Sequence, residues 1–400
     1  MNKKKESKVV PNVRFKGFTD DWKQRKLGEI ITEYKKTVDS DCTLPILTSS
    51  KTEGVILQEE HFGRKQQHDI TGYNILPRNY CTYRNRSDGV DFTFNINKCC
   101  DKGIISKFYP VFSGKNSDVF FLSLVLNNSD EVVREIAYTC TGTGQKVLSF
   151  LDLQKMKVRV PSFDEQKEIA TYFDSLDHLI TLHQQKLTLL TKLKKAMLEK
   201  MFPKKGSVIP EFRFNGFANA WEQRKLGELA FFNPKEKLPD VFEYVDLESV
   251  VGIEMLSHRT EEKATAPSRA QRLAHTGDLF YQTVRPYQKN NYLFEKSEKH
   301  YVFSTGYAQL RPLVDGYFLL SLVQNGQFVK TVLDNCTGTN YPAINANDLA
   351  EIDVFYPKDE HEQHQIGEYF RHLDHLITLH QRKLDMLKKL KSACLSEMFI

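Results

Sequence analysis

The stretch 164–201 constrains the fold of this chain more than any other part of the sequence. Its apolar residues recur at alternating steps of four and three, and His183 and Lys194 occupy the two remaining positions of the series. This is the heptad pattern of a helix that packs lengthwise against another helix. The register returns before the C-terminus, where the nine residues 176–184 are repeated at 373–381. The predicted coiled-coil seam consists of Ile169, Phe173, Leu176, Ile180, His183, Leu187, Leu190, Ile366, Phe370, Leu373, Ile377, His380, Leu384 and Leu387.

Connectivity predicts that the two helices run antiparallel, with Asp164 and Asp359 as their N-caps. The chain between the helices starts where the first ends and finishes where the second begins, and these points are neighbours only in an antiparallel pair. An approximate twofold axis should then cross the centre of the pair, where His183 and His380 are expected to meet. Because two protonated imidazoles at one place repel each other, we expect acidification to destabilise the pair.

A second repeat shows that the whole chain is a tandem duplication. The segment Arg14–Glu29 returns as Arg213–Glu228, and each copy contains Trp-x-Gln-Arg-Lys-Leu-Gly-Glu. We predict that Trp22 and Trp221 anchor one core in each half. The predicted fold class is α+β: two mixed α/β domains joined by two long helices in an antiparallel coiled coil, with an internal pseudo-twofold repeat. The predicted segments are 1–162 (first domain), 163–206 (central helix and linker), 207–358 (second domain) and 359–400 (distal helix).

Composition places the chain among soluble folded proteins without proving its partner. The hydrophobic content is 40%, and the formal net charge is only +5. The sequence contains no apolar run long enough for a membrane span and no signal peptide. The seven cysteines are scattered and lack a Cys-x-x-Cys pair, which favours reduced thiols and a cytoplasmic location.

No catalytic or metal-binding motif stands out in the sequence. No Gly-x-Gly-x-x-Gly follows a predicted strand, and the run 141–146 lacks the spacing of a phosphate loop. Asp240, Glu261 and Lys263 match a loose nuclease pattern, in which two carboxylates would hold Mg²⁺. A chance match explains so short a pattern better, so we predict no catalytic residue and no metal site in this chain. A nuclease remains the weaker alternative, and a stand-alone protein that binds bipartite DNA is another.

Basic and amide side chains gather with aromatic ones in the parts where the two halves diverge. Such side chains reach phosphates and the edges of guanine and adenine. We therefore predict double-stranded DNA as the partner. The predicted DNA-binding residues are Ser49, Lys51, Arg64, Lys65, Gln66, Tyr83, Arg84, Asn85, Arg86, Thr141, Thr143, Gln145, Lys146, Arg269, Arg272, Arg285, Tyr287, Gln288, Lys289, Asn290, Thr337, Thr339, Asn340 and Tyr341.

These landmarks together resemble the specificity subunit of type I restriction–modification enzymes. The resemblance is carried by the two Trp-x-Gln-Arg-Lys-Leu-Gly-Glu motifs, by Thr-Gly-Thr at 141–143 and 337–339, and by the Glu-Gln pairs at 165–166 and 362–363. The two long helices complete the set, so the match covers essentially the whole chain. One departure is that Tyr341-Pro342 stands after the second Thr-Gly-Thr in the place of Gln145-Lys146 after the first.

The resemblance implies a non-catalytic DNA-recognition subunit with two target-recognition domains. Each domain would read one half of a bipartite, asymmetric DNA site, and the helices would set the gap between the half-sites. The helices would also dock two modification (methyltransferase) subunits, and restriction (motor–nuclease) subunits would join them. By this resemblance, S-adenosylmethionine, ATP and Mg²⁺ belong to the partner subunits, and this chain binds no cofactor.

Overall fold

The computed structural model describes residues 10–64, 69–142, 144–297, 299–338 and 340–399. It divides into two compact units: unit 1 comprises Met1–Leu182 with Lys383–Ile400, and unit 2 comprises His183–Arg382. The division cuts both long helices near their middle. Each unit therefore contains one half of the sequence repeat, part of the first helix and part of the second.

The long helices are α6 (Phe163–Lys200) and α10 (Glu360–Glu397), each of 38 residues. The first lies one residue earlier than the heptad pattern predicts. Asp359 is the predicted cap of α10, and its Oδ1 accepts a hydrogen bond from the backbone N–H of His361 at 2.9 Å. The prediction for α6 was wrong, because Ser162 caps this helix through its Oγ. Asp164 instead lies in the first turn, where its charge suits the helix dipole.

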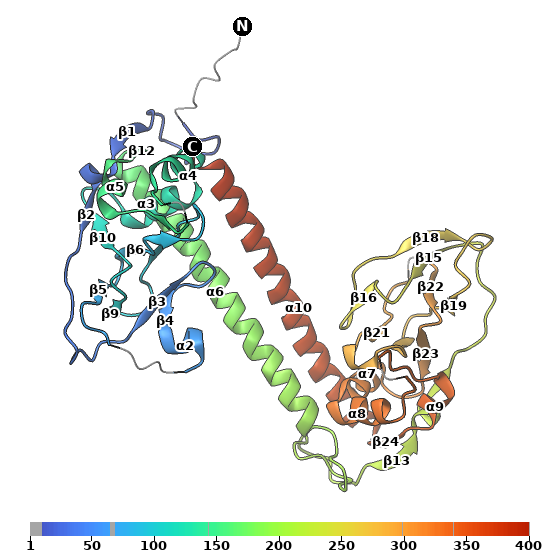
Figure 1. Cartoon of the computed structure of the whole chain (residues 1–400). Coiled ribbons are helices and arrows are strands. Elements are labelled where there is room, and N and C mark those ends of the chain that lie inside the picture. The colour runs from blue at the N-terminus through green and yellow to red at the C-terminus, as the bar shows by residue number, and fades with distance from the viewer. Residues whose placement is uncertain (1–9, 65–68, 143, 298, 339, 400) are drawn as a thin grey trace. The chain divides into compact units, whose positions relative to one another are not determined.

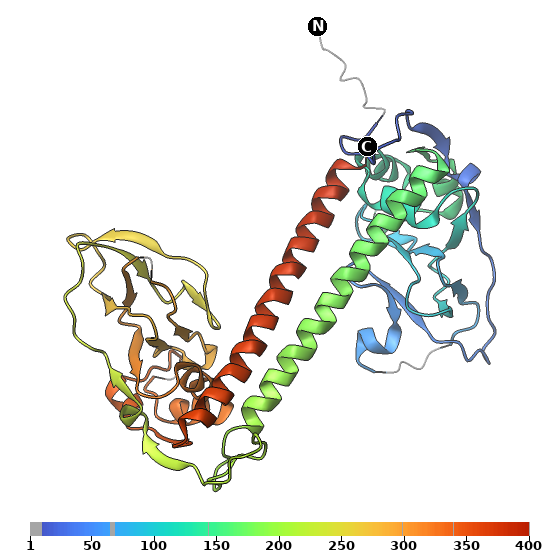
Figure 2. The same ribbon diagram turned by 180° about the vertical axis from the view of Figure 1, so that it is seen from behind.

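Contacts inside each unit confirm the antiparallel pairing, and Figure 1 and Figure 2 show α6 and α10 side by side. In unit 2, Lys194 near the end of α6 donates to Asp374 near the start of α10, at 2.5 Å. In unit 1, Lys391 donates to Asp177 in the same way. Every predicted seam residue is buried or half-buried. The basic residues in the seam are thus explained by paired carboxylates, and buried polar pairs of this kind fix the register of a coiled coil.

His183 and His380 meet as predicted, with 2.8 Å between their Nδ1 atoms. At this distance one ring donates a proton and the other accepts it, so protonating both rings would turn two N–H groups toward each other. Acidification is therefore expected to destabilise the helix pair.

The matched test replaces both rings by leucine. The double variant His183→Leu, His380→Leu should show a thermal unfolding midpoint that changes less between pH 5 and pH 8 than that of the parent, a window set by the ~6.5 reference. An unchanged pH profile in the double variant would contradict this account of the ring pair.

Unit 1 combines short strands with short helices (Figure 1). One sheet has the order β2-β10-β6-β8, and the ladders β3-β4 and β5-β9 are linked by a parallel bridge between Ile46 and Ile104. The strands are β1 (Lys23–Lys26), β2 (Ile31–Glu33), β3 (Leu47–Ser50), β4 (Gly54–Leu57), β5 (Asn74–Pro77), β6 (Cys81–Tyr83), β7 (Arg86–Ser87), β8 (Phe94–Ile96), β9 (Lys102–Ile105), β10 (Val111–Gly114), β11 (Lys146–Val147) and β12 (Lys157–Val160). The helices are α1 (Leu27–Ile30), α2 (Gln58–Phe62), α3 (Val119–Asn128), α4 (Asp130–Thr139) and α5 (Phe150–Lys155).

Unit 2 repeats this arrangement with more complete sheets. The sheet β14-β23-β20-β21 corresponds to β2-β10-β6-β8, and β18-β15-β22-β19 corresponds to the linked ladders. The strands are β13 (Glu222–Lys225), β14 (Ala230–Phe232), β15 (Val241–Val245), β16 (Val250–Val251), β17 (Glu254–Met255), β18 (Arg259–Glu262), β19 (Ala270–Leu273), β20 (Leu279–Gln282), β21 (Tyr292–Leu293), β22 (Tyr301–Ser304), β23 (Tyr307–Pro312) and β24 (Asp353–Tyr356). The helices are η1 (Leu226–Glu228), η2 (Pro286–Gln288), α7 (Gly316–Gln324), α8 (Gly326–Asp334) and α9 (Ala346–Ala350).

Each unit has one buried tryptophan at the centre of an aromatic cluster, as predicted. Trp22 packs edge-on against Phe121 at 5.8 Å and against Phe399 at 6.5 Å, measured between ring centroids. Trp221 packs in the same way against Phe202 at 5.8 Å. Phe202 follows the end of α6, and Phe399 follows the end of α10. The end of each long helix therefore completes the core of one unit.

The segments before the two tryptophans close on the ends of the long helices in equivalent ways. In unit 2 the backbone N–H of Phe212 donates to the carbonyl of Lys200 at 2.9 Å. In unit 1 the N–H of Val13 donates to the carbonyl of Glu397 at 3.0 Å. The connection is covalent in unit 2, through the linker, and non-covalent in unit 1, between segments from opposite ends of the sequence.

The glutamate of each Glu-Gln pair at the start of the long helices holds one of these segments in place. Arg14 donates two hydrogen bonds to Glu165, at 2.6 and 2.7 Å, and Arg213 binds Glu362 with the same geometry and distances. Both carboxylates are buried. Bidentate arginine–carboxylate pairs are among the strongest polar contacts in proteins, so the repeated motif is explained by structure.

One ion pair joins each α/β domain to a long helix, and the signs of the two charges are reversed between the units. In unit 1, Lys98 lies 3.2 Å from Asp174 on α6. At the equivalent place in unit 2, Glu295 lies 3.6 Å from Arg371 on α10. If the two domains were exchanged, Lys98 would face Arg371 and Glu295 would face Asp174, and both pairs would repel.

Candidate DNA interface

The Thr-Gly-Thr loop occupies the same place in both units. Thr141 pairs with Val147, and Thr337 pairs with Ala343, so each loop is closed by a bridge at its base. Gly142 has a φ of +104°, and a Cβ at this position would lie 2.3 Å from the carbonyl oxygen of Gln145. Only glycine fits that position. Thr143 and Thr339 lie outside the described residues, while Thr141 and Thr337 are exposed.

Each loop is bound to the segment that follows β6 in unit 1 or β20 in unit 2. Leu148 donates through its N–H to the carbonyl of Asn85, and Ile344 donates to Thr283, both at 3.0 Å. The equivalent position of Asn85 is thus Thr283. The basic segment 83–86 therefore corresponds to 281–284, and the basic run after position 284 has no equivalent place in unit 1.

This correspondence corrects one predicted contact. Tyr83 is fully buried, and its hydroxyl donates to the carbonyl of Leu148 at 3.1 Å. Its equivalent in unit 2, Tyr281, is also fully buried. Tyr83 is therefore a core residue, and the prediction that it contacts DNA was wrong. Its neighbour Asn85 is half-buried, and its Oδ1 has no hydrogen-bond partner among the described residues.

In unit 1, four predicted DNA contacts line one cavity of about 670 Å³. They are Ser49, Lys51, Arg84 and Arg86. Both arginines are exposed, and the guanidinium of Arg86 lies 4.6 Å above the ring of Phe108. Lys51 is paired with Asp91 on the cavity wall, and Ser49 accepts a hydrogen bond from Asn95 at 2.8 Å. Stacking holds the guanidinium of Arg86 in place without neutralising its charge.

The remaining predicted residues of unit 1 lie around the Thr-Gly-Thr loop and after β4. Gln145 is exposed, and Lys146 donates to the carbonyl of Gly142 at 2.8 Å within its own loop. Arg64 is exposed, whereas Lys65 and Gln66 lie outside the described residues.

In unit 2, Arg285 and Tyr341 form the counterpart of the stacked arginine. The guanidinium of Arg285 lies 4.4 Å above the ring of Tyr341, which is exposed. Arg285 adopts a left-handed φ of +54° at the start of η2. Tyr341, which departs from the first loop's sequence, thereby supplies the aromatic face. Tyr287, Asn340 and Arg269 are also exposed, and none of them forms a cation–π contact with another described residue.

Three other predicted residues of unit 2 are used inside the fold. The ammonium group of Lys289 donates to the carbonyl of Gln324 at 2.8 Å, and burial lowers the pKa of this amine. The Oδ1 of Asn290 accepts from the N–H of Gly252, and Gln288 accepts from Gln282, both at 2.8 Å. These contacts order the 285–291 segment, so Lys289 would have to leave its carbonyl partner to reach a phosphate.

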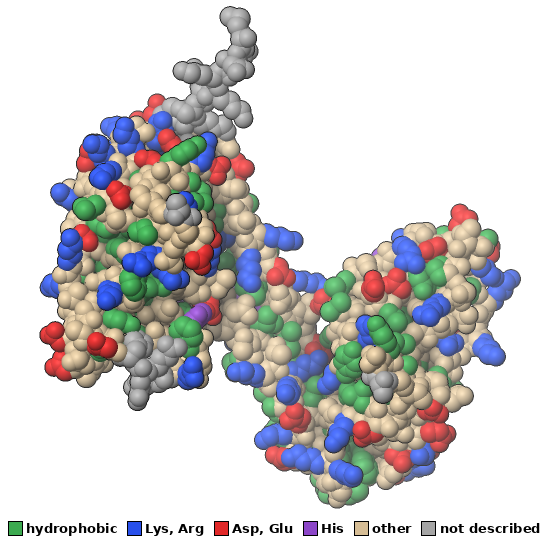
Figure 3. Space-filling view, viewed as in Figure 1, with side chains coloured by type: hydrophobic (Ala, Val, Ile, Leu, Met, Phe, Trp, Pro, Cys, Tyr) green, Lys and Arg blue, Asp and Glu red, His purple; other side chains and the backbone are tan. Residues whose placement is uncertain are grey.

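The predicted arginines share one electrostatic property. Within the described part of the chain, none of them forms an ion pair with a carboxylate; they are Arg64, Arg84, Arg86, Arg269, Arg272 and Arg285. By contrast, carboxylates neutralise the half-buried arginines at Arg14, Arg159, Arg213 and Arg311. Figure 3 shows acidic and basic side chains mixed on the visible face of each unit. The uncompensated charges are therefore local features within a mixed surface.

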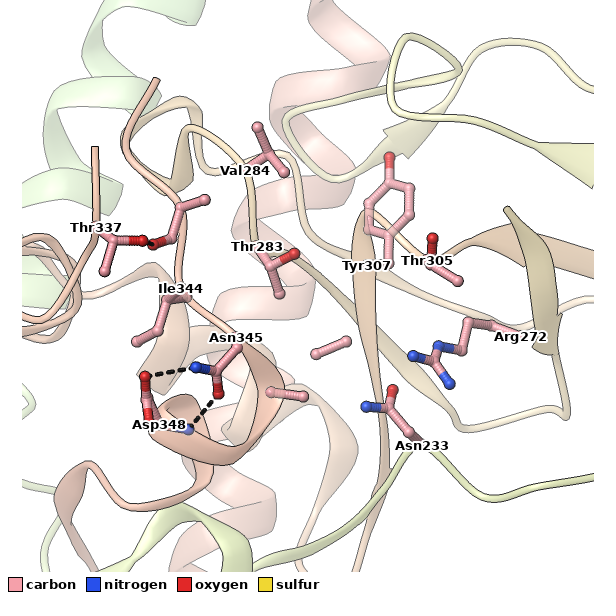
Figure 4. Close-up of a pocket in the computed structure, with 13 residues that line it drawn as sticks. Asn233, Arg272, Thr283, Val284, Thr305, Tyr307, Thr337, Ile344, Asn345 and Asp348 are labelled. Carbon is pink, nitrogen blue, oxygen red and sulfur yellow. Dashed lines mark hydrogen bonds between the residues drawn. The ribbon is translucent and has the colours of Figure 1, made fainter. Parts of the chain in front are cut away.

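A pocket of unit 2 contains one residue that sequence reasoning missed. Its volume is about 380 Å³, and Asn233 and Arg272 lie together at one side of it (Figure 4). Asn233 directly follows β14 and adopts a left-handed φ of +46°. No sequence signal placed it beside Arg272, because the two residues come from different sheets.

The residues of the nuclease alternative have other partners. Glu261 accepts from Arg259 at 2.7 Å, and Lys263 donates to the carbonyl of Leu238 at 3.4 Å. In the residues that the structure describes, no group of three or more acidic, histidine or cysteine side chains could hold a metal ion. No helix of the described chain is long and apolar enough to cross a membrane.

Comparison with known proteins agrees with this architecture. The chain is 23% identical over 325 residues to the specificity subunit of the type I restriction enzyme MjaVIII from Methanocaldococcus jannaschii, which spans 72% of each chain. The structure is similar to the crystal structure of the type I restriction–modification S subunit from M. genitalium, with a TM-score of 0.63, 14% identity, and 98% and 99% of the two chains covered. It also resembles the HsdS subunit from Thermoanaerobacter tengcongensis, with a TM-score of 0.43, 17% identity, and 94% and 96% covered.

The family model for the type I restriction modification DNA specificity domain matches residues 19–192 and 260–389. These two segments correspond to the two repeated halves, each with most of its long helix. The sequence repeat, the antiparallel helices and the two mixed α/β domains thus receive one explanation: the chain belongs to the type I restriction–modification specificity family and contains two target-recognition domains.

Proposed function

We propose that each α/β domain of this chain reads one half of a bipartite, asymmetric DNA site. The observation that carries the proposal is the set of arginines without carboxylate partners. A guanidinium that the protein does not neutralise can bind phosphate oxygens or the acceptor edge of guanine. Arg86 and Arg285 are also held by aromatic rings. Because the two domains differ in these residues, the half-sites differ as well.

The chain acts in this proposal as the non-catalytic recognition subunit of a larger complex. The S-adenosylmethionine, ATP and Mg²⁺ needed for methylation and restriction belong to the modification and restriction subunits. A stand-alone bipartite DNA-binding protein is the rival, and it would need no surface for such partners. Exposed apolar side chains on the long helices support such a surface.

An apolar stripe flanks the seam of the coiled coil in each unit. In unit 1 it contains Leu179, Leu182, Met386 and Leu390, and in unit 2 it contains Leu376, Leu379, Leu189 and Leu193. Each of these side chains is at least 37% exposed. The α/β domain of each unit contacts the opposite flank of the seam, through Asp174 or Arg371. We infer that each stripe docks a helix of one modification subunit, so that the repeat binds two copies.

This docking proposal predicts a change in stoichiometry. Leu179→Glu places a charge in one stripe and should release one modification subunit, while Leu179→Glu combined with Leu376→Glu should release both. Native mass spectrometry of the reconstituted complex measures the number of copies bound. Thr181→Glu, on the opposite flank, is the matched control and should keep both subunits. Release of both subunits by the control, with the helices still folded, would count against the stripes as the docking surface.

Salt titration of DNA binding tests the recognition proposal itself. In the complex with modification subunits, Arg84→Ala, Arg86→Ala and Arg285→Ala should each weaken DNA binding. Loss of a phosphate contact should reduce the slope of log K against log salt by roughly one, whereas loss of a base contact should reduce only the preference for the target. Arg224→Ala is the control, because Glu222 and Glu228 neutralise this arginine. If all three variants bind DNA as the parent does, the arginines do not form the interface.

A further inference from the structure

The pocket in unit 2 is bordered by the two four-stranded sheets of that unit (Figure 4). Asn233 directly follows β14 of one sheet, Arg272 lies in β19 of the other, and Thr305 lies between β22 and β23. The opposite side is formed by residues 343–346 and by Asp348. The carboxylate of Asp348 accepts a hydrogen bond from the side chain of Asn345 at 2.6 Å, which keeps it at that side.

Arg272 enters this pocket because of an irregularity in its strand. The pairing of β19 with β22 shifts register between Ala270 and Arg272. Such a bulge re-aims the side chain that follows it. The Nε of Arg272 is buried and makes no hydrogen bond with any described residue. Burial without a compensating carboxylate lowers the pKa of this guanidinium, which identifies a desolvated positive charge that the protein leaves unpaired.

Asn233 presents a second donor whose orientation is fixed. Its Oδ1 accepts from the backbone N–H of Gln309 at 2.9 Å, and its own N–H donates to the carbonyl of Gln309 at 2.7 Å. Because Oδ1 already accepts this hydrogen bond, Nδ2 is the side-chain atom of Asn233 that is left to bind a ligand. Within the described residues, this Nδ2 has no acceptor. The pocket therefore contains two unpaired donor groups side by side.

We propose that this pocket binds a phosphate group, held by the guanidinium of Arg272 and the Nδ2 of Asn233. A phosphate supplies both acceptor oxygens and the negative charge that Arg272 lacks. The edge of a base supplies acceptors but no charge, so it would leave the desolvated cation uncompensated. Resting on the proposed function, the source of this phosphate is the DNA backbone, and the pocket is a positioning contact of the second target-recognition domain.

The first arm of the test uses the full chain without DNA. Inorganic phosphate that binds the folded state raises the unfolding temperature in a saturable way. We expect this rise for the parent, relative to chloride at equal ionic strength, and its loss in Arg272→Met and in Asn233→Leu. Arg224→Met is the matched control, since Glu222 and Glu228 neutralise this exposed arginine and it lies outside the pocket, and it should keep the rise. Equal responses of parent and pocket variants would overturn the phosphate site.

The second arm uses the complex with modification subunits and two duplexes, one with the target site and one without. If the phosphate comes from DNA, Arg272→Met should weaken binding to both duplexes by a similar factor, roughly tenfold, and lower the salt slope by about one. A loss confined to the target duplex would overturn the phosphate assignment in favour of a base edge. A saturable phosphate response with unchanged DNA binding would overturn the DNA source and leave a site for a free anion.

The two arms also separate this inference from the proposed function. If the parent complex shows no sequence preference in DNA binding, the proposed function fails, and the first arm still decides whether the pocket takes phosphate. If the parent complex prefers its target and Arg272→Met changes neither arm, the pocket inference alone is overturned.

Discussion

A chain in which residues 31–149 are replaced by its own residues 230–345 is expected to recognise a symmetric DNA site. The two segments occupy equivalent places: β2 and β14 begin at Ile31 and Ala230, and Ser149 and Asn345 cap α5 and α9. Both units of the chimera would then contain the recognition residues of the second domain. The recognised sequence should become an inverted repeat of the second half-site, and the first half-site should disappear.

The charge-swapped contacts determine how this chimera must be built. Glu295 would arrive beside Asp174, where Lys98 was removed, and the two carboxylates would repel each other. The chimera should therefore also contain Asp174→Arg, which restores the pair found between Glu295 and Arg371. Without that change we expect a less stable first unit with the same sequence preference.

Sequencing of methylated DNA after expression with the modification subunits measures the result. Specific sites are typically bound about 10³–10⁷ times more tightly than non-specific DNA, so the loss of one half-site is a large effect. A chimera that folds and methylates DNA but changes both half-sites to unrelated sequences would show that the domains do not read independently.

Arg213→Met is expected to destabilise unit 2 by about 3–5 kcal/mol, because it leaves a carboxylate buried without its partner. Glu362 is only 1% exposed and accepts two hydrogen bonds from Arg213 and one from Trp221. After the change, the indole N–H is the only one of these donors that remains. The segment before Trp221 would also lose its ion pair with α10 and would keep ring contacts there, such as that between Phe214 and Tyr369.

The two tryptophans allow the loss to be measured in one unit at a time. In a Trp22→Phe background, urea unfolding followed by fluorescence reports unit 2 through Trp221. Arg213→Met should lower the unfolding midpoint strongly, and adding Glu362→Met should recover most of the loss, since an apolar replacement of a buried pair is often close to neutral. A double variant as unstable as the single one would show that packing of the arginine, and not its charge, holds the segment.

The sequence predicted the frame of this molecule because the frame is repeated. Heptad spacing alone located α6 within one residue, and the pseudo-twofold relation placed His183 against His380. These predictions rest on periodicity and symmetry, which survive without knowledge of tertiary contacts. The cap of α6 was missed because Ser162 and Asp164 are both good capping residues, and only the backbone geometry decides which of them precedes the first turn.

The predicted interface was less accurate because side-chain type does not reveal direction. Tyr83 is the buried last residue of β6, whereas Arg84, directly after the strand, is exposed. Lys289 has a side chain suited to binding phosphate, but its ammonium group donates a hydrogen bond to the carbonyl of Gln324. Asn233 was overlooked because its neighbour in the pocket, Arg272, is distant in sequence and belongs to another sheet.

The non-covalent junction between the segment at Val13 and the end of α10 makes the order of elements in this chain cyclic. In each unit the segment before the tryptophan binds the end of a long helix. In unit 2 a peptide linker also connects the two, and in unit 1 only non-covalent contacts do. A circular permutation that opened the linker after Phe202 and joined the segments at Val13 and Glu397 would keep every element in its place. In such a permuted chain the second domain would precede the first, and the contacts within each unit would be unchanged.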